Sequence, residues 1–234
     1  MAELRQTETI VEDAKELTNV VAAVRPLLGT VPDPGVKYRF YLMEEELPNA
    51  FAVPGGHIVV TQGLLKLVER PEDIAGVIAH ELAHVTQRHS LRQTVSSAGP
   101  YFLCRLFLRG NGGLMGVLAG SSQLLVCQSF SQEFEYEADD VGWGYLVAAR
   151  IDPRGLAEML RRLEEEVERL KLGDSVPQAF SSHPATAKRI RRLEEKWQKL
   201  RDKSGFIQYE KPHARRALPE LAGETGAAVA EDEL

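Results

Sequence analysis

The pentapeptide His80-Glu81-Leu82-Ala83-His84 contains residue types that bind zinc and activate water. Its two histidines are four residues apart, so on an α-helix their imidazoles share one face, about one turn apart. Imidazoles so placed can occupy two corners of a zinc tetrahedron. Glu81 lies at the edge of that face, where its carboxylate can reach a zinc-bound water without becoming a ligand. The alternative is a core helix that carries two surface or capped histidines.

A zinc site of this kind needs a third protein ligand. His89 is one residue short of the position that an elongated histidine motif requires, which is Ser90 in this chain, so that motif is excluded. The next candidates are the acids of residues 133–140. Within this segment, Glu135 and Asp139 are four residues apart and share a helical face.

Two interpretations of this acidic segment are open. One is a solvated helix face, which is the usual role of clustered acids. In the other, Glu135 binds zinc while Asp139 accepts a hydrogen bond from the outer nitrogen of a ligand histidine, a common arrangement around bound metals. One helix would then supply both a ligand and its support.

Two predicted helices carry these residues. Pro71 suits a first helical position, and the acids that follow it suit the positive end of the helix dipole. An apolar face then predicts an active-site helix over about residues 71–90. The third-ligand helix is predicted over about residues 132–149.

A small antiparallel sheet is predicted before the histidine motif, over about residues 36–62. Its three segments are short, rich in β-forming residues and separated by turns: 38–42, 50–53 and 57–61.

The last of these segments is predicted to be the edge strand of the sheet. An extended substrate peptide could add to that strand by main-chain hydrogen bonds, and an ordinary sheet strand is the alternative. The residues concerned are His57, Ile58, Val59 and Val60.

The remaining pattern is mostly helical, which predicts an α+β fold that is mainly α, a zincin-like helical domain with a small edge sheet. Helices are predicted over residues 3–28, ending at Pro26, and over about 153–172 and 185–202. Residues 1–216 form one domain in this interpretation. The tail over 217–234 is predicted to be disordered, because its glycine, alanine and acids leave little to bury.

The composition excludes some classes of function. The formal net charge is −6, whereas a nucleic-acid binder needs a basic footprint. The first thirty residues lack a signal-peptide pattern, and no run of 18 or more apolar residues occurs, which predicts a soluble or peripheral protein. Two cysteines, Cys104 and Cys127, are too few for a disulfide scaffold and are predicted to be buried thiols.

An apolar stretch over residues 98–126 is rich in leucine and phenylalanine, and its only charged residues are Arg105 and Arg109. Three interpretations are open: a lid over the cleft, a patch in peripheral contact with a membrane, or an ordinary pair of core helices.

The histidine motif and the acidic segment together resemble the M48 metallopeptidases, a gluzincin family, in the branch of HtpX, Oma1 and BepA. In this family a glutamate ligand precedes an aspartate by four residues. The resemblance therefore implies Glu135 as the third zinc ligand and Asp139 as the supporting acid. Gln132 stands where the family has an arginine, which puts a salt bridge or substrate contact in doubt but not the metal.

Two more segments resemble the same family, in the same order along the chain. One covers residues 49–56 and reads Asn-Ala-Phe-Ala-Val-Pro-Gly-Gly. The other is Ser182-His183-Pro184, followed by Arg189-Ile190. The matching stretches extend from residue 49 to about residue 192.

This resemblance implies a zinc-dependent endopeptidase that acts on unfolded or damaged proteins, with one Zn²⁺ per chain and Glu81 as the general base. It also implies His183 and Arg189 as candidates to stabilise the oxyanion. His183 has two other interpretations: a fourth zinc ligand that keeps the enzyme latent, or a cap of the following helix. The location implied by the relatives is the bacterial cell envelope.

Two rival functions belong to other classes. The first is a latent or non-catalytic zinc-binding chaperone or assembly protein; Glu81 argues against it, because zinc binding alone does not require that residue. The second is a scaffold built on the charged C-terminal helices.

Overall fold

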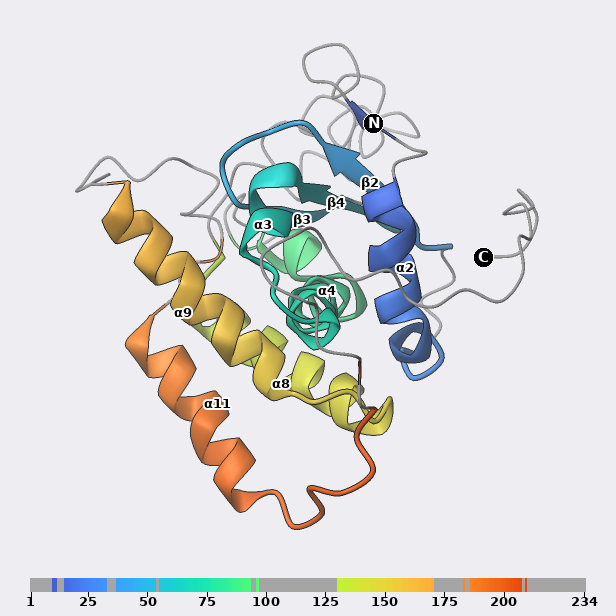
Figure 1. Cartoon of the computed structure of the whole chain (residues 1–234). Coiled ribbons are helices and arrows are strands. Elements are labelled where there is room, and N and C mark those ends of the chain that lie inside the picture. The colour runs from blue at the N-terminus through green and yellow to red at the C-terminus, as the bar shows by residue number, and fades with distance from the viewer. Residues whose placement is uncertain are drawn as a thin grey trace, which may run out of the picture.

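The computed structural model describes residues 10–11, 15–32, 37–53, 55–93, 96, 130–170, 183, 186–207 and 209, and these form helices around a small sheet (Figure 1). The strands are β1 (Ile10–Val11), β2 (Arg39–Met43), β3 (Ala50–Val53) and β4 (His57–Thr61). The helices are α2 (Lys15–Leu28), α3 (Gln62–Leu67), α4 (Pro71–Thr86), α8 (Gln132–Ala148), α9 (Arg154–Arg169) and α11 (Ala187–Lys199). The predicted class, α+β and mainly α, is confirmed.

The sheet differs from the prediction in two respects. Its strand order is β1-β2-β4-β3, and β2 pairs with β4 in parallel, so the sheet is mixed rather than antiparallel throughout. The prediction that His57, Ile58, Val59 and Val60 form an edge strand is wrong, because β4 is hydrogen-bonded to β2 on one side and to β3 on the other. The continuous apolar run of β4 is typical of a strand that is buried on both faces. The edges of the described sheet are β1 and β3.

Two helix ends also differ from the prediction. Ile10 and Val11 belong to a strand, and α2 begins only at Lys15. Pro26 lies inside α2, which continues to Leu28. The apolar side of the helix is still buried at this point, since Leu27 has no exposed surface. Burial there offsets the backbone hydrogen bond that proline cannot donate.

The helix that carries the histidine motif ends at Thr86 rather than near Ser90. Arg88 has a positive φ of 55°, which interrupts the helical path, and a short helical turn over residues 89–93 follows. This bend changes the direction in which His89 projects relative to the helix axis.

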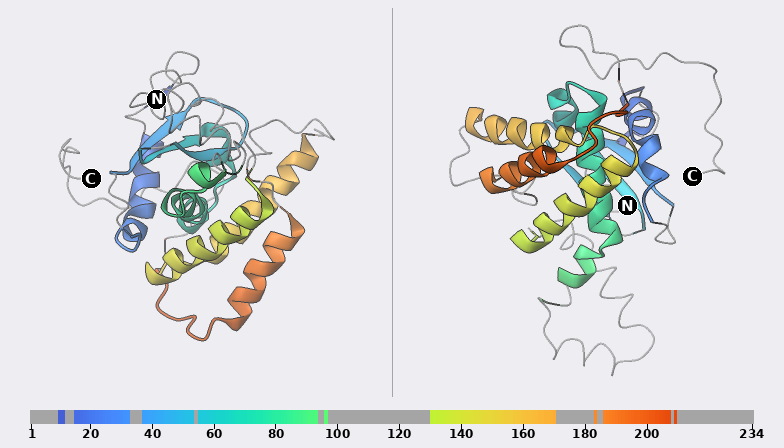
Figure 2. Two further views of the ribbon diagram at one scale, coloured as in Figure 1. Left: turned by 180° about the vertical axis from the view of Figure 1, so that it is seen from behind. Right: turned by 90° about the horizontal axis from the view of Figure 1, so that it is seen from below.

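Helix α4 lies at the centre of the described fold, with α2, α8, α9 and the sheet around it (Figures 1 and 2). Residues 73–84 of this helix are buried without exception. Two helices approach its backbone closely at glycine: a Cβ on Gly76 would lie 2.4 Å from the Leu156 nitrogen of α9, and one on Gly142 of α8 would lie 2.9 Å from the Ala79 oxygen. Glycine at these contacts therefore sets how near α8 and α9 come to the histidine motif.

Within the described ranges, no helix is both long and apolar enough to cross a membrane. The apolar stretch 98–126, Cys104, Cys127 and the tail 217–234 lie outside the described residues. The interpretation of residues 1–216 as a single domain stays a prediction.

Replacing Gly76 by alanine should destabilise the fold although alanine favours helices. The added methyl group would meet the backbone of α9, and overpacking of this kind costs about 1–3 kcal/mol. Gly144→Ala is the matched control, because a Cβ at this exposed helical position meets nothing within 4 Å and should stabilise α8 by up to about 1 kcal/mol. Urea denaturation followed by circular dichroism measures both. Equal stability of the two variants would contradict the close contact of α4 and α9.

Candidate metal centre

Local sequence fixes the starts of α4 and α8, the helices that carry His80, His84 and Glu135. The backbone N–H of Arg70 donates to the Asp73 carboxylate at 2.9 Å, and Arg162 of α9 donates to the same carboxylate at 2.7 Å, which fixes the start of α4. The start of α8 is capped by Ser131, whose hydroxyl oxygen accepts from the Phe134 N–H at 3.3 Å.

Four side chains converge between α4, α8 and the segment before α11. The Nε2 atoms of His80 and His84 are 3.0 Å apart, and they lie 3.3 and 3.4 Å from the two carboxylate oxygens of Glu135. His183 Nδ1 lies 3.0 Å from Glu135 Oε1 and 3.4 Å from His80 Nε2. One ligand atom from each residue lies within 4.8 Å of the other three. The structure therefore brings the three predicted ligands together and adds His183 to them.

The set fits a divalent metal ion such as zinc. Two imidazole nitrogens and one carboxylate are a known zinc donor set with a fourth position open. His80, His84 and Glu135 are 1–3 % exposed, so an ion held by them would be shielded from bulk solvent. Their convergence from two helices far apart in sequence favours a metal centre over two separately capped histidines.

The outer nitrogen of His80 has the partner that the spacing predicts. Its Nδ1 lies 3.0 Å from Asp139 Oδ1. Asp139 in turn accepts from Arg189 at 2.8 and 2.7 Å. A histidine held in this way keeps its ring orientation and leaves Nε2 for a metal.

The outer nitrogen of His84 has a partner that the sequence analysis missed. His84 Nδ1 lies 2.9 Å from His89 Nδ1, and the fully buried His89 ring stacks on Phe134 with centroids 4.7 Å apart. The other nitrogen of His89 lies 3.4 Å from Glu137. Spacing excluded His89 only as a direct ligand. Its placement beside His84 depends on the turn after Thr86, which no motif indicates.

Arg189 takes a different position from that of a free oxyanion donor. Its guanidinium is 2 % exposed and pairs with Glu135 Oε2 at 2.7 Å as well as with Asp139. Burial alone would lower the pKa of Arg189, but these two carboxylates outweigh it and raise the pKa above its ordinary value. The geometry is typical of a residue that positions other side chains.

Glu81 lies beside the ligands without joining them. Its Oε2 accepts a hydrogen bond from the backbone N–H of Ala52 in β3 at 3.1 Å, and its Oε1 lies 3.7 Å from His183 Nε2. Burial raises the pKa of this carboxyl group above its ordinary value. A carboxylate whose pKa is raised by burial, held at the edge of a metal site, is better suited to accept a proton than an exposed one.

Burial and neighbouring charge give the ligands different pKa values. Burial alone would lower the pKa of His80, but Glu135 and Asp139 outweigh it and raise it to about 9. Burial holds the pKa of His84 well below its ordinary value. Burial would raise the pKa of Glu135, but the imidazoles of His183 and His80 outweigh it and hold that pKa well below the usual range. Glu135 is therefore ionised and ready to bind a cation.

Gln132, which stands where the resembling family has an arginine, is exposed at the first position of α8. Among the described residues, the Gln132 side chain makes no hydrogen bond or ion pair. The four side chains therefore converge without an arginine at this position.

Comparison with known proteins gives one family. The model of peptidase family M48 matches residues 12–197. The chain is 31% identical over 165 residues to the beta-barrel assembly-enhancing protease of Yersinia pestis. The aligned region is 65% of this chain and 33% of that protein. It is 32% identical over 163 residues to the mitochondrial metalloendopeptidase OMA1 of Schizosaccharomyces pombe, covering 68% and 47%.

A third relative covers more of both chains. The protease HtpX homolog of Salinibacter ruber is 32% identical over 216 residues, which is 78% of this chain and 75% of that protein. This chain therefore spans between a third and a half of the first two relatives, and three quarters of the third.

Removing the buried Arg189 charge should destabilise the metal-free protein strongly. Arg189→Met leaves the carboxylates of Asp139 and Glu135 without their cation in the interior, which costs about 3–5 kcal/mol. Arg161→Met is the control, because Arg161 pairs with the half-exposed Glu158 and Glu194 on the surface, and such pairs contribute below about 1 kcal/mol. Urea unfolding in the presence of a chelator measures both. Similar losses for the two variants would contradict the role assigned to Arg189.

Proposed function

Because this chain belongs to peptidase family M48, we propose that it is a zinc-dependent endopeptidase that hydrolyses peptide bonds in unfolded or damaged proteins. The observation that carries the proposal is the convergence of His80, His84 and Glu135 beside the carboxylate of Glu81. A protein that only stored zinc would not need that carboxylate at the edge of the site.

One Zn²⁺ per chain would be held by His80, His84 and Glu135. When bound, zinc supplies Lewis acidity, which polarises a peptide carbonyl and makes water a stronger acid near neutral pH. Asp139 holds the ring of His80 through its outer nitrogen, and Arg189 holds Asp139 and Glu135 in place. Arg189 is thus a positioning residue in this proposal.

Glu81 performs the proton transfers. Its carboxylate takes a proton from the attacking water and later gives it to the amine of the departing peptide. The N–H of Ala52 orients this carboxylate from the sheet side. Burial raises the pKa of this group, which favours uptake of the proton.

The substrate backbone would bind along β3, which is an edge strand in the described sheet. Residues 49, 51 and 53 face β4, as the hydrogen bond from the Thr61 N–H to the Asn49 carbonyl at 3.0 Å shows. Ala50 and Ala52 alternate with them, so their N–H and C=O groups point away from β4. The Ala52 N–H donates to Glu81, which leaves the two carbonyl groups and the Ala50 N–H for a peptide. A peptide that adds to this edge uses main-chain hydrogen bonds and reads little sequence, which suits unfolded substrates.

The position of His183 supports a second candidate function, that of a latent enzyme. Its imidazole lies 3.0 Å from Glu135 and 3.7 Å from Glu81. The imidazole therefore occupies the space that a substrate carbonyl and a water molecule would need. We propose that His183 occupies the fourth position of the zinc site in a resting enzyme. If His183 never left that position, the protein would be a non-catalytic zinc-binding chaperone or assembly protein.

The location is proposed from relatives. Those reported above are named for beta-barrel assembly and for mitochondria, so we propose that this protein acts at a membrane or in a cell envelope. Protein chains, and not nucleic acids, are its proposed partners, in keeping with the net charge of −6.

Glu81→Gln should abolish proteolysis and leave metal binding unchanged. Loss of the general base lowers the rate by about 10²–10⁴-fold, whereas the ligands are untouched. Casein degradation and metal analysis measure the two properties, and Glu133→Gln, at an exposed position of α8, is the control that should stay active. Both substitutions are also tested together with His183→Ala, so that a latent wild-type enzyme cannot hide the loss of activity in Glu81→Gln. Full activity of Glu81→Gln together with His183→Ala would overturn the proposal.

His183→Ala should raise the casein-degrading rate of the zinc-loaded protein, because it frees the fourth position for substrate. It should also weaken zinc binding, since one donor is lost. Chelator competition measures the affinity and casein degradation measures the rate. A fall in rate at full zinc occupancy would show instead that His183 contacts the substrate.

A further inference from the structure

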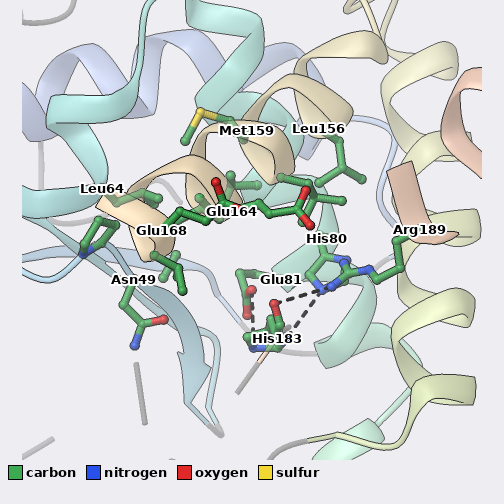
Figure 3. A pocket seen from close by; sticks show the side chains of 16 residues that line it. Asn49, Leu64, His80, Glu81, Leu156, Met159, Glu164, Glu168, His183 and Arg189 are labelled. Atoms are coloured by element: carbon green, nitrogen blue, oxygen red, sulfur yellow. Dashed lines mark hydrogen bonds and ion pairs between the residues drawn. The ribbon is translucent and has the colours of Figure 1, made fainter. Parts of the chain in front are cut away.

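A cavity of about 370 Å³ opens directly beside Glu81 and the candidate metal centre (Figure 3). His80, Glu81, His183 and Arg189 line one end of it. Its volume is within the range of sites that bury small ligands, about 300–1,000 Å³. A group that enters the cavity therefore lies next to the point of bond cleavage.

The walls of the cavity are apolar. They come from three helices that meet near the metal centre: Leu64 of α3, Val77 of α4, and Leu156, Met159, Leu160 and Leu163 of α9. Leu156, Met159 and Leu160 are at most 4 % exposed, so their positions are fixed by packing. Such a surface gains free energy when an apolar side chain displaces water from it.

The position of the cavity along β3 indicates which part of a bound substrate would enter it. Pro48, Asn49 and Ala50 line it, whereas residues 51–53 do not. A peptide that pairs antiparallel with β3 runs from Val53 toward Ala50. The part of the substrate that follows the cleaved bond therefore lies over the cavity, on the side of the departing amine.

The mouth of the cavity carries negative charge. Glu164 and Glu168 are exposed, line the cavity and lie one turn apart on α9. Figure 3 shows both above Glu81 and His183 in that view. Among the residues that the structure describes, neither is paired with a cation. Like charges at this spacing repel each other mildly, so a cation from the substrate would relieve that repulsion.

From these observations we infer that the cavity selects a large apolar side chain immediately after the cleaved bond, followed within a few residues by lysine or arginine. The inference rests on the proposed endopeptidase function and names its substrate class: amphipathic segments in which a leucine-sized residue precedes a basic one. Glu164 and Glu168 are specificity-determining residues in this account and take no part in bond cleavage.

Peptide binding tests the inference without relying on cleavage. Zinc-loaded Glu81→Gln is titrated into four fluorescein-labelled octapeptides that are otherwise Ser and Gly, and anisotropy is measured. The four peptides are the four combinations of Leu or Gly at one position with Lys or Asp two positions later. Leu should bind about tenfold or more tightly than Gly, because it is buried. Lys should bind about two- to fivefold more tightly than Asp, because the carboxylates at the mouth are exposed.

Variants locate each preference. Glu164→Lys/Glu168→Lys should reverse the Lys preference and leave the Leu preference intact. Glu16→Lys/Glu165→Lys is the matched control: it makes the same charge change at exposed positions that do not line the cavity, and it should keep both preferences. Val167→Trp, at a half-buried wall position, should remove the Leu preference by filling the cavity, whereas Val167→Ala should retain it.

Two outcomes separate this inference from the proposed function. Casein cleavage by wild type, together with equal or absent binding of all four peptides, would overturn the inference and leave the peptidase intact. Preference for the Leu-Lys peptide without casein cleavage, even after His183→Ala, would support the cavity and contradict the peptidase. A Lys preference that both double variants alter equally would overturn the role of Glu164 and Glu168.

Discussion

The structure depends on the compensation of buried charge between α4, α8 and α11. Glu135 and Asp139 are 1–2 % exposed, where an unpaired carboxylate would be prohibitively unstable. Arg189 contacts both, and His80 lies close to the same oxygen atom of each carboxylate. These contacts keep the carboxylates ionised, as their lowered pKa values show. A site that holds two anions in the interior is already suited to a divalent cation, and the same charges fix the three helices relative to one another.

The rest of the fold supports that cluster by close packing around α4. Glycines at positions 76 and 142 let α9 and α8 approach its backbone, which brings Glu135 within reach of two histidines one turn apart. The edge strand β3 meets the same helix from the sheet side, where Ala52 donates to Glu81. The carboxylate proposed as the general base therefore lies between the candidate metal ligands and the strand proposed to hold the substrate, and the apolar cavity begins where that strand begins.

The sequence predicted the parts of the site that depend on local spacing. Two histidines four residues apart, and Glu135 four residues before Asp139, share helical faces wherever those helices lie. The long-range features were not predictable in this way. Whether β4 lies at the edge or the centre of the sheet is decided by its parallel pairing with β2, and no hairpin pattern indicates such pairing. His89 reaches His84 only because the chain bends at Arg88.

The central claim is that two helices hold one zinc ion through two imidazoles and one carboxylate. X-ray absorption at the zinc edge of the loaded protein tests it directly, on wild type and on Glu135→Gln. The account predicts a four-coordinate site of nitrogen and oxygen neighbours at about 2.0–2.2 Å, with two or three imidazoles according to whether His183 is bound. It also predicts a change in that first shell when Glu135 is replaced. A zinc site with sulfur neighbours, or one identical in both proteins, would contradict it.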